Sequence, residues 1–264
     1  ADFDSVRALA GEFRSKFDKL NYFVENAGGV IIPGAGYQGP FVTKEGFEAL
    51  YAGNYLGHFL LLNLLLDLIK SSEPARISLT SSIAHWGATQ NLTSLLPIEG
   101  YNARKSQEHS ATLASAFEQY CNTKLLQIAM AFELQRRLGP ESNVTVTPVA
   151  PGMVNTNIPY GNRDKKLGMS NPLALNVKDG AQTTLHALFS KSIEGQTGYF
   201  LQPYWTPLHQ SKPLGPLGLS VIFFEWLLQR VTWGCFLWIS HPKTNQLTFQ
   251  KQLWEESLQA VGLV

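Results

Sequence analysis

The sequence contains little cysteine and almost no net charge. Its two cysteines, Cys121 and Cys235, lie far apart, which favours free thiols and a reducing compartment over a disulfide framework. The 21 basic residues are balanced by 20 acidic residues, which gives a net charge of +1. Proteins that bind nucleic acid usually carry a clear positive excess, so we expect no nucleic-acid partner. The six histidines have no spacing typical of a metal site, and we expect no metal.

A long uninterrupted apolar run is also absent. Residues 214–239 are apolar at both ends, but Glu225 and Arg230 interrupt the centre of the segment, where charges disfavour a membrane span. We therefore expect residues 206–245 to form a helical lid over a substrate site. The alternative is peripheral membrane contact through residues 214–239. The expected location is the cytoplasm or the cytosolic surface of a membrane.

Short apolar runs alternate along the chain with helical segments. We predict strands in residues 20–28, 76–82 and 144–149, with a long apolar helix that begins near Lys44 between the first two strands. A second helix, around residue 120, separates the second and third strands. This alternation is typical of a parallel sheet in an α/β protein, and we expect one domain over residues 1–264.

Tyr120 and Lys124 are four residues apart in a predicted helix. At about 3.6 residues per turn their side chains lie on one face, so the lysine charge can favour the phenolate form of the tyrosine. A free phenol has a pKa of roughly 10 and needs such a cation to act as a base near neutral pH. The pair is therefore a candidate proton-transfer device, although an exposed structural pair has the same spacing.

Further motifs accompany this pair in a fixed order. They are Asn-Ala-Gly at residues 26–28, Asn54 in the apolar helix, a serine at the end of the second strand, and Pro-Gly-x-Val-x-Thr at residues 151–156. With Tyr120 and Lys124, these motifs resemble those of the short-chain dehydrogenase/reductase family. The ending of the chain also resembles the retinol-dehydrogenase-like branch. The resemblance implies a Rossmann-type doubly wound parallel sheet and hydride transfer between NAD(P)(H) and a secondary or allylic alcohol or carbonyl.

The resemblance implies a catalytic tetrad of Asn54, Ser82, Tyr120 and Lys124. In that reading Tyr120 exchanges the proton and Ser82 orients the carbonyl. Asn54 positions Lys124 through a water and passes the proton outward. We prefer Ser82 to Ser81 because the family's serine precedes a two-residue step and then a glycine or similar residue.

A cofactor site is implied in the same way, with NADP as the expected cofactor and NAD not excluded. The residues concerned either follow predicted strands or belong to the catalytic helix: Asn26, Ala27, Gly28, Tyr120, Lys124, Pro151, Gly152 and Thr156. The first three are expected to line the adenosine side, and the last three the nicotinamide end. Glu25 stands where the family more often has asparagine, and its carboxylate could disfavour an anionic group nearby.

The aromatic residues of the expected lid favour a bulky apolar substrate. A retinoid, a steroid and a polyketide-like ketone all fit this description. We therefore interpret the chain as an oxidoreductase that acts on a secondary metabolite or a lipid.

The resemblance begins only after the family's third strand, so the strand, glycine-rich turn and helix that bind pyrophosphate are expected to be missing before Ala1. The pattern G-x-G-x-x-G at residues 34–39 does not replace them, because it follows Pro33 and is followed by Pro40 instead of joining a strand to a helix. The strand at residues 22–24 is then expected to be an apolar edge that favours homo-oligomers. The competing hypothesis is a truncated non-catalytic remnant that acts as an interaction or regulatory protein.

Overall fold

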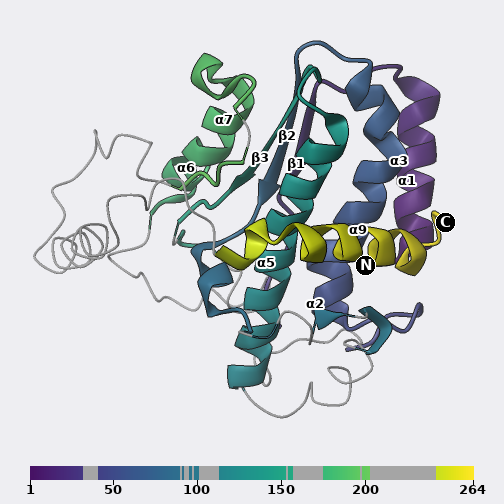
Figure 1. Cartoon of the computed structure of the whole chain (residues 1–264), viewed down its shortest axis with the longest axis vertical. Helices are drawn as coiled ribbons and strands as arrows, with labels where there is room; N and C mark the ends of the chain where they lie inside the picture. Colours follow the sequence, from purple (N-terminus) through teal and green to yellow (C-terminus); the bar gives the residue numbers. More distant parts are fainter. Residues whose placement is uncertain are drawn as a thin grey trace, which may run out of the picture.

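The protein is built on a parallel three-stranded sheet (Figure 1). The computed structural model describes residues 1–31, 41–89, 91, 95–96, 98–100, 113–152, 154–156, 175–196, 198–202 and 242–264. The strands are β1 (Tyr22–Glu25), β2 (Ala75–Thr80) and β3 (Val144–Val149), in the order β1-β2-β3. Leu201 adds a parallel bridge to Val149 beside β3. The predicted parallel sheet is confirmed.

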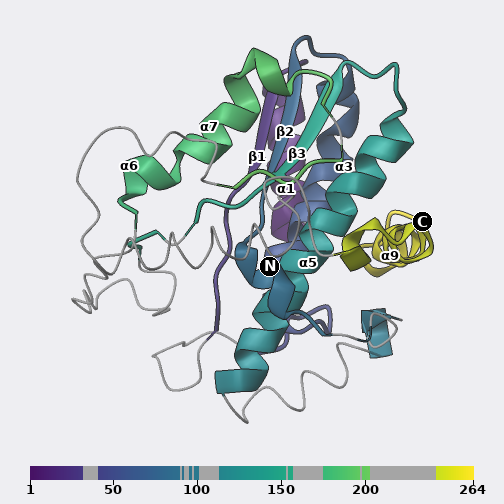
Figure 2. The ribbon, with the colours of Figure 1, turned by 60° about the vertical axis from the view of Figure 1, so that its left-hand side comes forward.

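Helices cover both faces of this sheet, as Figures 1 and 2 show. Helices α1 (Phe3–Lys16), α3 (Gly57–Lys70) and α5 (Leu113–Leu138) lie on one face, and α9 (Leu247–Ala260) packs against α5. The other face carries α6 (Val177–Gly180) and α7 (Gln182–Phe189), with α7 contacting β2 and β3. Short helical turns complete the described fold: η2 (Ile83–Gly87), η5 (Lys191–Ile193) and η7 (Pro242–Asn245). Layers on both faces confirm the doubly wound α/β prediction.

The predicted apolar helix begins later than the sequence suggested. It starts with α2 (Ala49–Tyr51), continues through a π-helical turn, η1 (Ala52–Leu56), and joins α3. Gly46 closes a turn at φ 86°, and the carboxylate of Glu48 then accepts hydrogen bonds from the first backbone N–H groups of α2. A carboxylate that accepts from free N–H groups defines a helix start, so the predicted start near Lys44 was wrong.

The run Ala49–Lys70 is long and apolar enough to cross a membrane by length and composition alone. In the folded chain 56% of its most apolar window is buried, as expected for a core helix. Its aromatic residues pack against α9: Phe59 meets Trp254 edge to face at 4.9 Å, and the Tyr55 hydroxyl lies 2.8 Å from Ser257 Oγ. The C-terminal helix is therefore part of the core.

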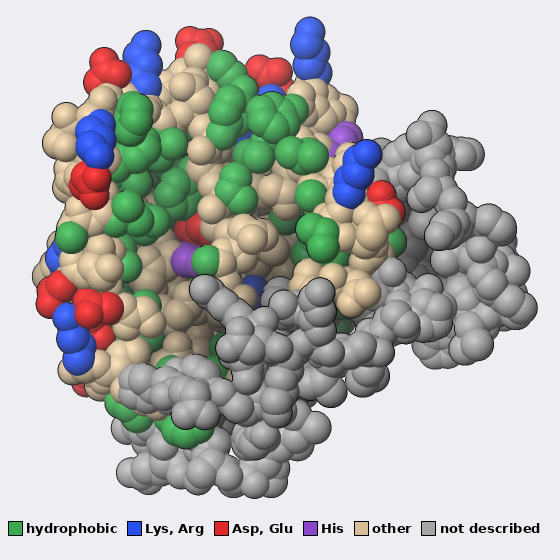
Figure 3. Space-filling view, turned by 180° about the vertical axis from the view of Figure 1, so that it is seen from behind, with side chains coloured by type: hydrophobic (Ala, Val, Ile, Leu, Met, Phe, Trp, Pro, Cys, Tyr) green, Lys and Arg blue, Asp and Glu red, His purple; other side chains and the backbone are tan. Residues whose placement is uncertain are grey.

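The edge of the sheet carries exposed apolar side chains. Among the described residues β1 pairs only with β2, and Tyr22 and Val24 are each 40% exposed. Leu185 and Phe189 of α7 are exposed as well, and Figure 3 shows apolar side chains gathered on the face seen from behind.

Self-association through this edge stays a prediction, and so does the single domain over residues 1–264. Most of the predicted lid at residues 206–245 lies outside the described residues, which resume at residue 242.

Trp254→Ala tests the docking of α9. Removing this buried ring leaves a cavity beside Phe59, and we expect the free energy of unfolding to fall by about 3–5 kcal/mol in urea denaturation. Arg137→Ala is the control, since its guanidinium lies 5.0 Å from the Trp254 ring and its loss should lower stability by about 1 kcal/mol or less. Equal effects of the two variants would show that burial of the ring contributes little.

Candidate active site

The segments that follow the three strands come together at one edge of the sheet. Asn26, Ala27 and Gly28 follow β1, and all three are exposed. Thr80 at the end of β2 donates a hydrogen bond to the Asn26 side chain at 3.5 Å, and Ser81 N donates to Val149 O at the end of β3 at 2.8 Å. The carboxyl edge of a parallel sheet is where open α/β proteins bind ligands. The structure thus places the strand-end motifs together.

The two serines after β2 have different surroundings. The buried Ser81 hydroxyl donates to the backbone carbonyl of Lys124 at 2.7 Å, which fastens the strand end to α5. Ser82 is only partly buried, and its hydroxyl accepts from Ala84 N at 3.1 Å, which caps the turn η2. The Ser81 hydroxyl is therefore used within the structure, whereas Ser82 is the more accessible of the two serines.

Tyr120 lies on α5 opposite Ser82. The Ser82 hydroxyl lies close enough to the phenol to lower its pKa, although the two residues come from segments far apart in the sequence. Gly87 lies where η2 packs closely against α5, because a Cβ at this position would lie 3.1 Å from the Cys121 sulfur. A side chain at position 87 would crowd the Cys121 sulfur, so this glycine permits the close packing of η2 against α5.

The electrostatics of Tyr120 differ from the sequence-based expectation. Burial raises the pKa of its phenol above the ordinary value, and the hydrogen bond with Ser82 opposes this effect. The Lys124 ammonium lies 5.5 Å from the centre of the phenol ring. In the folded chain the phenol therefore holds its proton at neutral pH, whereas the spacing alone suggested a lowered pKa.

Lys124 is buried beside the tyrosine. Its Nζ donates to Thr80 O and to Gln127 Oε1, each at 2.9 Å. Burial lowers the pKa of the ammonium to about 8, and the nearby Glu25 carboxylate opposes that shift. An ammonium group has three N–H donors, so two are used by described residues and the third has no acceptor among them.

Glu25 is an acidic group with no hydrogen-bond partner in the described structure. It is buried, neither carboxyl oxygen has a hydrogen bond, and burial raises its pKa to about 8, with Lys124 opposing the shift. His58 Nδ1 lies 3.5 Å from Glu25 Oε2. This contact is not an ion pair, because burial and the Lys124 charge lower the pKa of His58 to about 4 and keep the imidazole neutral.

Asn54 sits in the π-helical turn η1. Its side chain bonds both backbone groups of Gly29, accepting from the N–H at 3.0 Å and donating to the carbonyl at 2.9 Å. It also donates to Thr123 Oγ1 at 3.1 Å. A π turn displaces side chains from the regular helical positions and often occurs at functional sites. Asn54 thus joins the loop after β1 to α5, and it bonds no atom of the Lys124 side chain directly.

The remaining predicted cofactor residues form the rim of this edge. A Cβ on Gly28 would lie 3.0 Å from Asn54 Oδ1 and 3.6 Å from Lys124 Nζ, so a side chain there would crowd the centre of the site. Pro151 and Gly152 follow β3, and Gly152 has φ 79°, a conformation that favours glycine. Thr156 is partly buried further along the same segment. Residues 34–39 lie outside the described residues.

Sequence reasoning did not identify three residues that shape the site. Gln127 holds the Lys124 ammonium, His58 lies against Glu25, and Thr123 links Asn54 to the backbone of Tyr120. Thr123 directly precedes Lys124, and Gln127 follows Lys124 by three residues. The sequence alone therefore already predicts both residues on the helix that carries Lys124. His58 is four residues after Asn54, but the π turn makes such spacing an unreliable guide to direction.

Glu25→Gln should stabilise the protein more strongly at pH 8 than at pH 5. The native carboxyl keeps its proton up to a pKa of about 8, while the ordinary value is 4.5. The unfolded chain therefore releases this proton first, and the native protein loses stability as the pH rises between these values. The gain in free energy of unfolding should be about 1–3 kcal/mol larger at pH 8, measured by urea denaturation.

Glu141→Gln, at an exposed position, controls for the loss of one carboxylate and should show no such difference. A Glu25→Gln gain that is the same at both pH values would contradict the assignment of a protonated buried carboxyl.

Known proteins resemble this chain in sequence over most of its length. It is 32% identical to polyprenol dehydrogenase of Homo sapiens over 210 residues, which are 76% of this chain and 58% of that protein. It is 32% identical to retinol dehydrogenase 14 of Homo sapiens over 212 residues, 76% of this chain and 55% of that protein. The chain thus spans little more than half the length of these relatives. No family model matches it.

Solved structures share the fold. An uncharacterized protein from Mycobacterium paratuberculosis superposes with a TM-score of 0.60 at 24% identity, covering 99% of this chain and 72% of that one. A short-chain dehydrogenase from Shigella flexneri 2a, solved as a complex with NADP, gives a TM-score of 0.52 at 17% identity, covering 77% of this chain and 71% of that one. Because the sequence relatives are dehydrogenases and the shared fold is that of short-chain dehydrogenases, the chain belongs to the short-chain dehydrogenase/reductase family.

Proposed function

We propose that this protein interconverts a carbonyl and an alcohol on a bulky apolar substrate, with NADP as its cofactor and Tyr120 as the general acid and base. The observation that carries the proposal is the proximity of the Ser82 hydroxyl, just after β2, to the Tyr120 phenol of α5, close enough to lower the pKa of that phenol. Two hydroxyls at one point form a site for an oxygen atom that gains negative charge during a reaction. NADPH would supply the hydride that reaches the carbon of that carbonyl.

Tyr120 and Ser82 divide the remaining chemistry. The raised pKa of the Tyr120 phenol keeps it protonated, so it donates a proton to the carbonyl oxygen during reduction. Ser82 donates a hydrogen bond to the same oxygen and fixes its position. In the oxidative direction Tyr120 must take a proton back, and the positive charge of Lys124 favours that step.

The residues around Lys124 fit a dinucleotide. Its third N–H is available to a ribose hydroxyl, since Thr80 and Gln127 occupy the other two. The exposed Asn26, Ala27 and Gly28 offer a backbone surface with little side-chain bulk for the adenosine side. NADP is our choice because the Shigella relative was solved with that cofactor.

The substrate class rests on the relatives. Their names specify a polyprenol and a retinol, both long apolar alcohols. We extend that class to this chain, together with a location in the cytoplasm or at the cytosolic surface of a membrane. The alternative, a non-catalytic interaction protein, draws support from the exposed apolar side chains of Tyr22, Val24 and Phe189. It predicts no turnover from any substrate.

Tyr120→Phe should lower turnover of an apolar ketone or aldehyde by about two to four orders of magnitude, because a positioned general acid is lost. Affinity for NADPH, measured by fluorescence titration, should stay the same. Lys124→Ala should reduce both turnover and affinity. Near-normal turnover in Tyr120→Phe would refute the assigned role.

The neighbouring serines give a matched pair of variants. Ser82→Ala should lower turnover by about 10²–10³-fold, as loss of one donor to a developing oxyanion does, with little change in melting temperature. Ser81→Ala should instead lower the free energy of unfolding by about 1–2 kcal/mol, because a buried hydrogen bond to the Lys124 carbonyl is lost. The reverse pattern would mean that Ser81 is the catalytic serine.

A further inference from the structure

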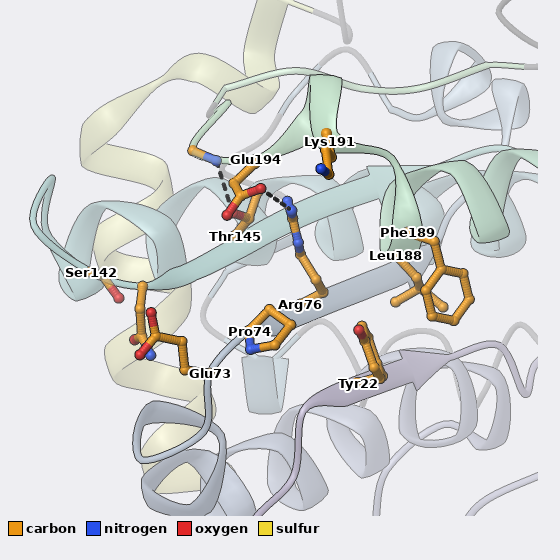
Figure 4. A pocket seen from close by; sticks show the side chains of 12 residues that line it. Tyr22, Glu73, Pro74, Arg76, Ser142, Thr145, Leu188, Phe189, Lys191 and Glu194 are labelled. Carbon is orange, nitrogen blue, oxygen red and sulfur yellow. Dashed lines mark hydrogen bonds and ion pairs between the residues drawn. The ribbon is translucent and has the colours of Figure 1, made fainter.

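A hollow of about 610 Å³ lies at the amino-terminal edge of the sheet (Figure 4). Its walls include Tyr22 and Arg76, which begin or nearly begin their strands, and Phe189 at the end of α7. Ser82 lies just beyond the opposite end of β2. The hollow is therefore separate from the site proposed for Tyr120 and the cofactor, and its volume is in the range of small-molecule sites.

Three side chains form a row across the floor of this hollow. Tyr22 pairs with Arg76 in the strand register, and Arg76 pairs with Thr145. Residues paired in this way point to the same face of a sheet. That face is the one covered by α7, since the Tyr22 and Phe189 rings lie 4.9 Å apart.

Arg76 is a buried cation whose hydrogen bonding is incomplete. Its side chain is 7% exposed, and Nη1 has no hydrogen-bond partner in the described structure. Its charge partner is Glu194, whose Oε2 lies 3.4 Å from Nη2 and whose side chain is 67% exposed. A buried guanidinium is unfavourable unless its charge and N–H groups are satisfied. An anion in the hollow would meet both requirements.

The remaining walls set the character of that anion. Tyr22, Pro74, Leu188 and Phe189 give the hollow an apolar side next to the guanidinium, as Figure 4 shows. A planar guanidinium matches a carboxylate through two parallel hydrogen bonds. A phosphate dianion is less suitable, because the carboxylates of Glu73 and Glu194 also line the hollow and balance the charges of Arg76 and Lys191.

We propose that this hollow binds a small carboxylate with an aliphatic or aromatic body. Arg76 receives the carboxylate through Nη1 and Nη2, and the body lies against the rings of Tyr22 and Phe189. The carboxylate of Glu194 occupies part of the ligand's place in the structure described here. The Glu194 side chain can move away from Arg76 easily, because most of that side chain is exposed to solvent. This function is separate from the proposed oxidoreductase chemistry and does not depend on it.

Calorimetric titration of the whole protein with octanoate tests the proposal, with 1-octanol and inorganic phosphate as comparison ligands. We expect saturable octanoate binding that both comparison ligands lack. Glu194→Gln should tighten octanoate binding by roughly threefold to tenfold, because a competing carboxylate is removed. Glu73→Gln makes the same charge change at a residue that forms no ion pair with Arg76 in the described structure, and it should alter affinity by less than about twofold.

Two further variants separate binding from folding. Arg76→Gln should abolish octanoate binding, but it alters a buried residue and can also unfold the protein. Phe189→Ala changes a side chain that is 59% exposed, so the fold should remain, while octanoate binding weakens by about fivefold or more. Octanoate binding that is absent, or that responds equally to Glu73→Gln and Glu194→Gln, would overturn the proposal and leave Arg76 as a structural residue.

Discussion

The buried ammonium of Lys124 constrains the arrangement of the candidate active site. A charged amine removed from water is unfavourable unless its charge and its N–H groups find partners. Here Thr80 and Gln127 accept its hydrogen bonds and Glu25 supplies a nearby carboxyl group. Thr80 ends β2, Glu25 ends β1 and Gln127 lies on α5, so one side chain connects two strand ends to the helix that carries Tyr120.

The same burial explains the unusual acidities of the site. It raises the pKa of Tyr120 and Glu25 and lowers that of Lys124, because each group is harder to ionise away from water. At neutral pH Tyr120 and Glu25 therefore keep their protons and are neutral, while Lys124 is still mostly charged. Under the proposed function a bound cofactor and substrate would change these surroundings, so the acidity of Tyr120 would depend on what is bound beside it.

Much of the fold was predictable because its signals are local. Each strand is a short apolar run, and each predicted catalytic residue lies in a motif of fixed spacing, such as Tyr120 and Lys124 on one helix face. The start of α2 was not predictable from apolar periodicity, because Glu48 sets it through two hydrogen bonds to backbone N–H groups. The acidity of Tyr120 was also missed, since the spacing to Lys124 carries no information about burial.

The alternation of β1 assigns its residues to two different sites. Phe23 and Glu25 point to the buried face, while Tyr22 and Val24 point to the face of α7. A carboxyl group that ends this strand at an inward position must therefore lie in the interior, close to the Lys124 ammonium. An aromatic residue at the first outward position must lie beside Arg76 of the neighbouring strand. The period-two geometry of a strand thus sets Glu25 and Tyr22 on opposite faces, and their places at the two ends of β1 put Glu25 at the candidate active site and Tyr22 at the hollow. A one-residue shift of β1 would exchange these two side chains between the faces and leave both Lys124 and Arg76 with unsuitable neighbours.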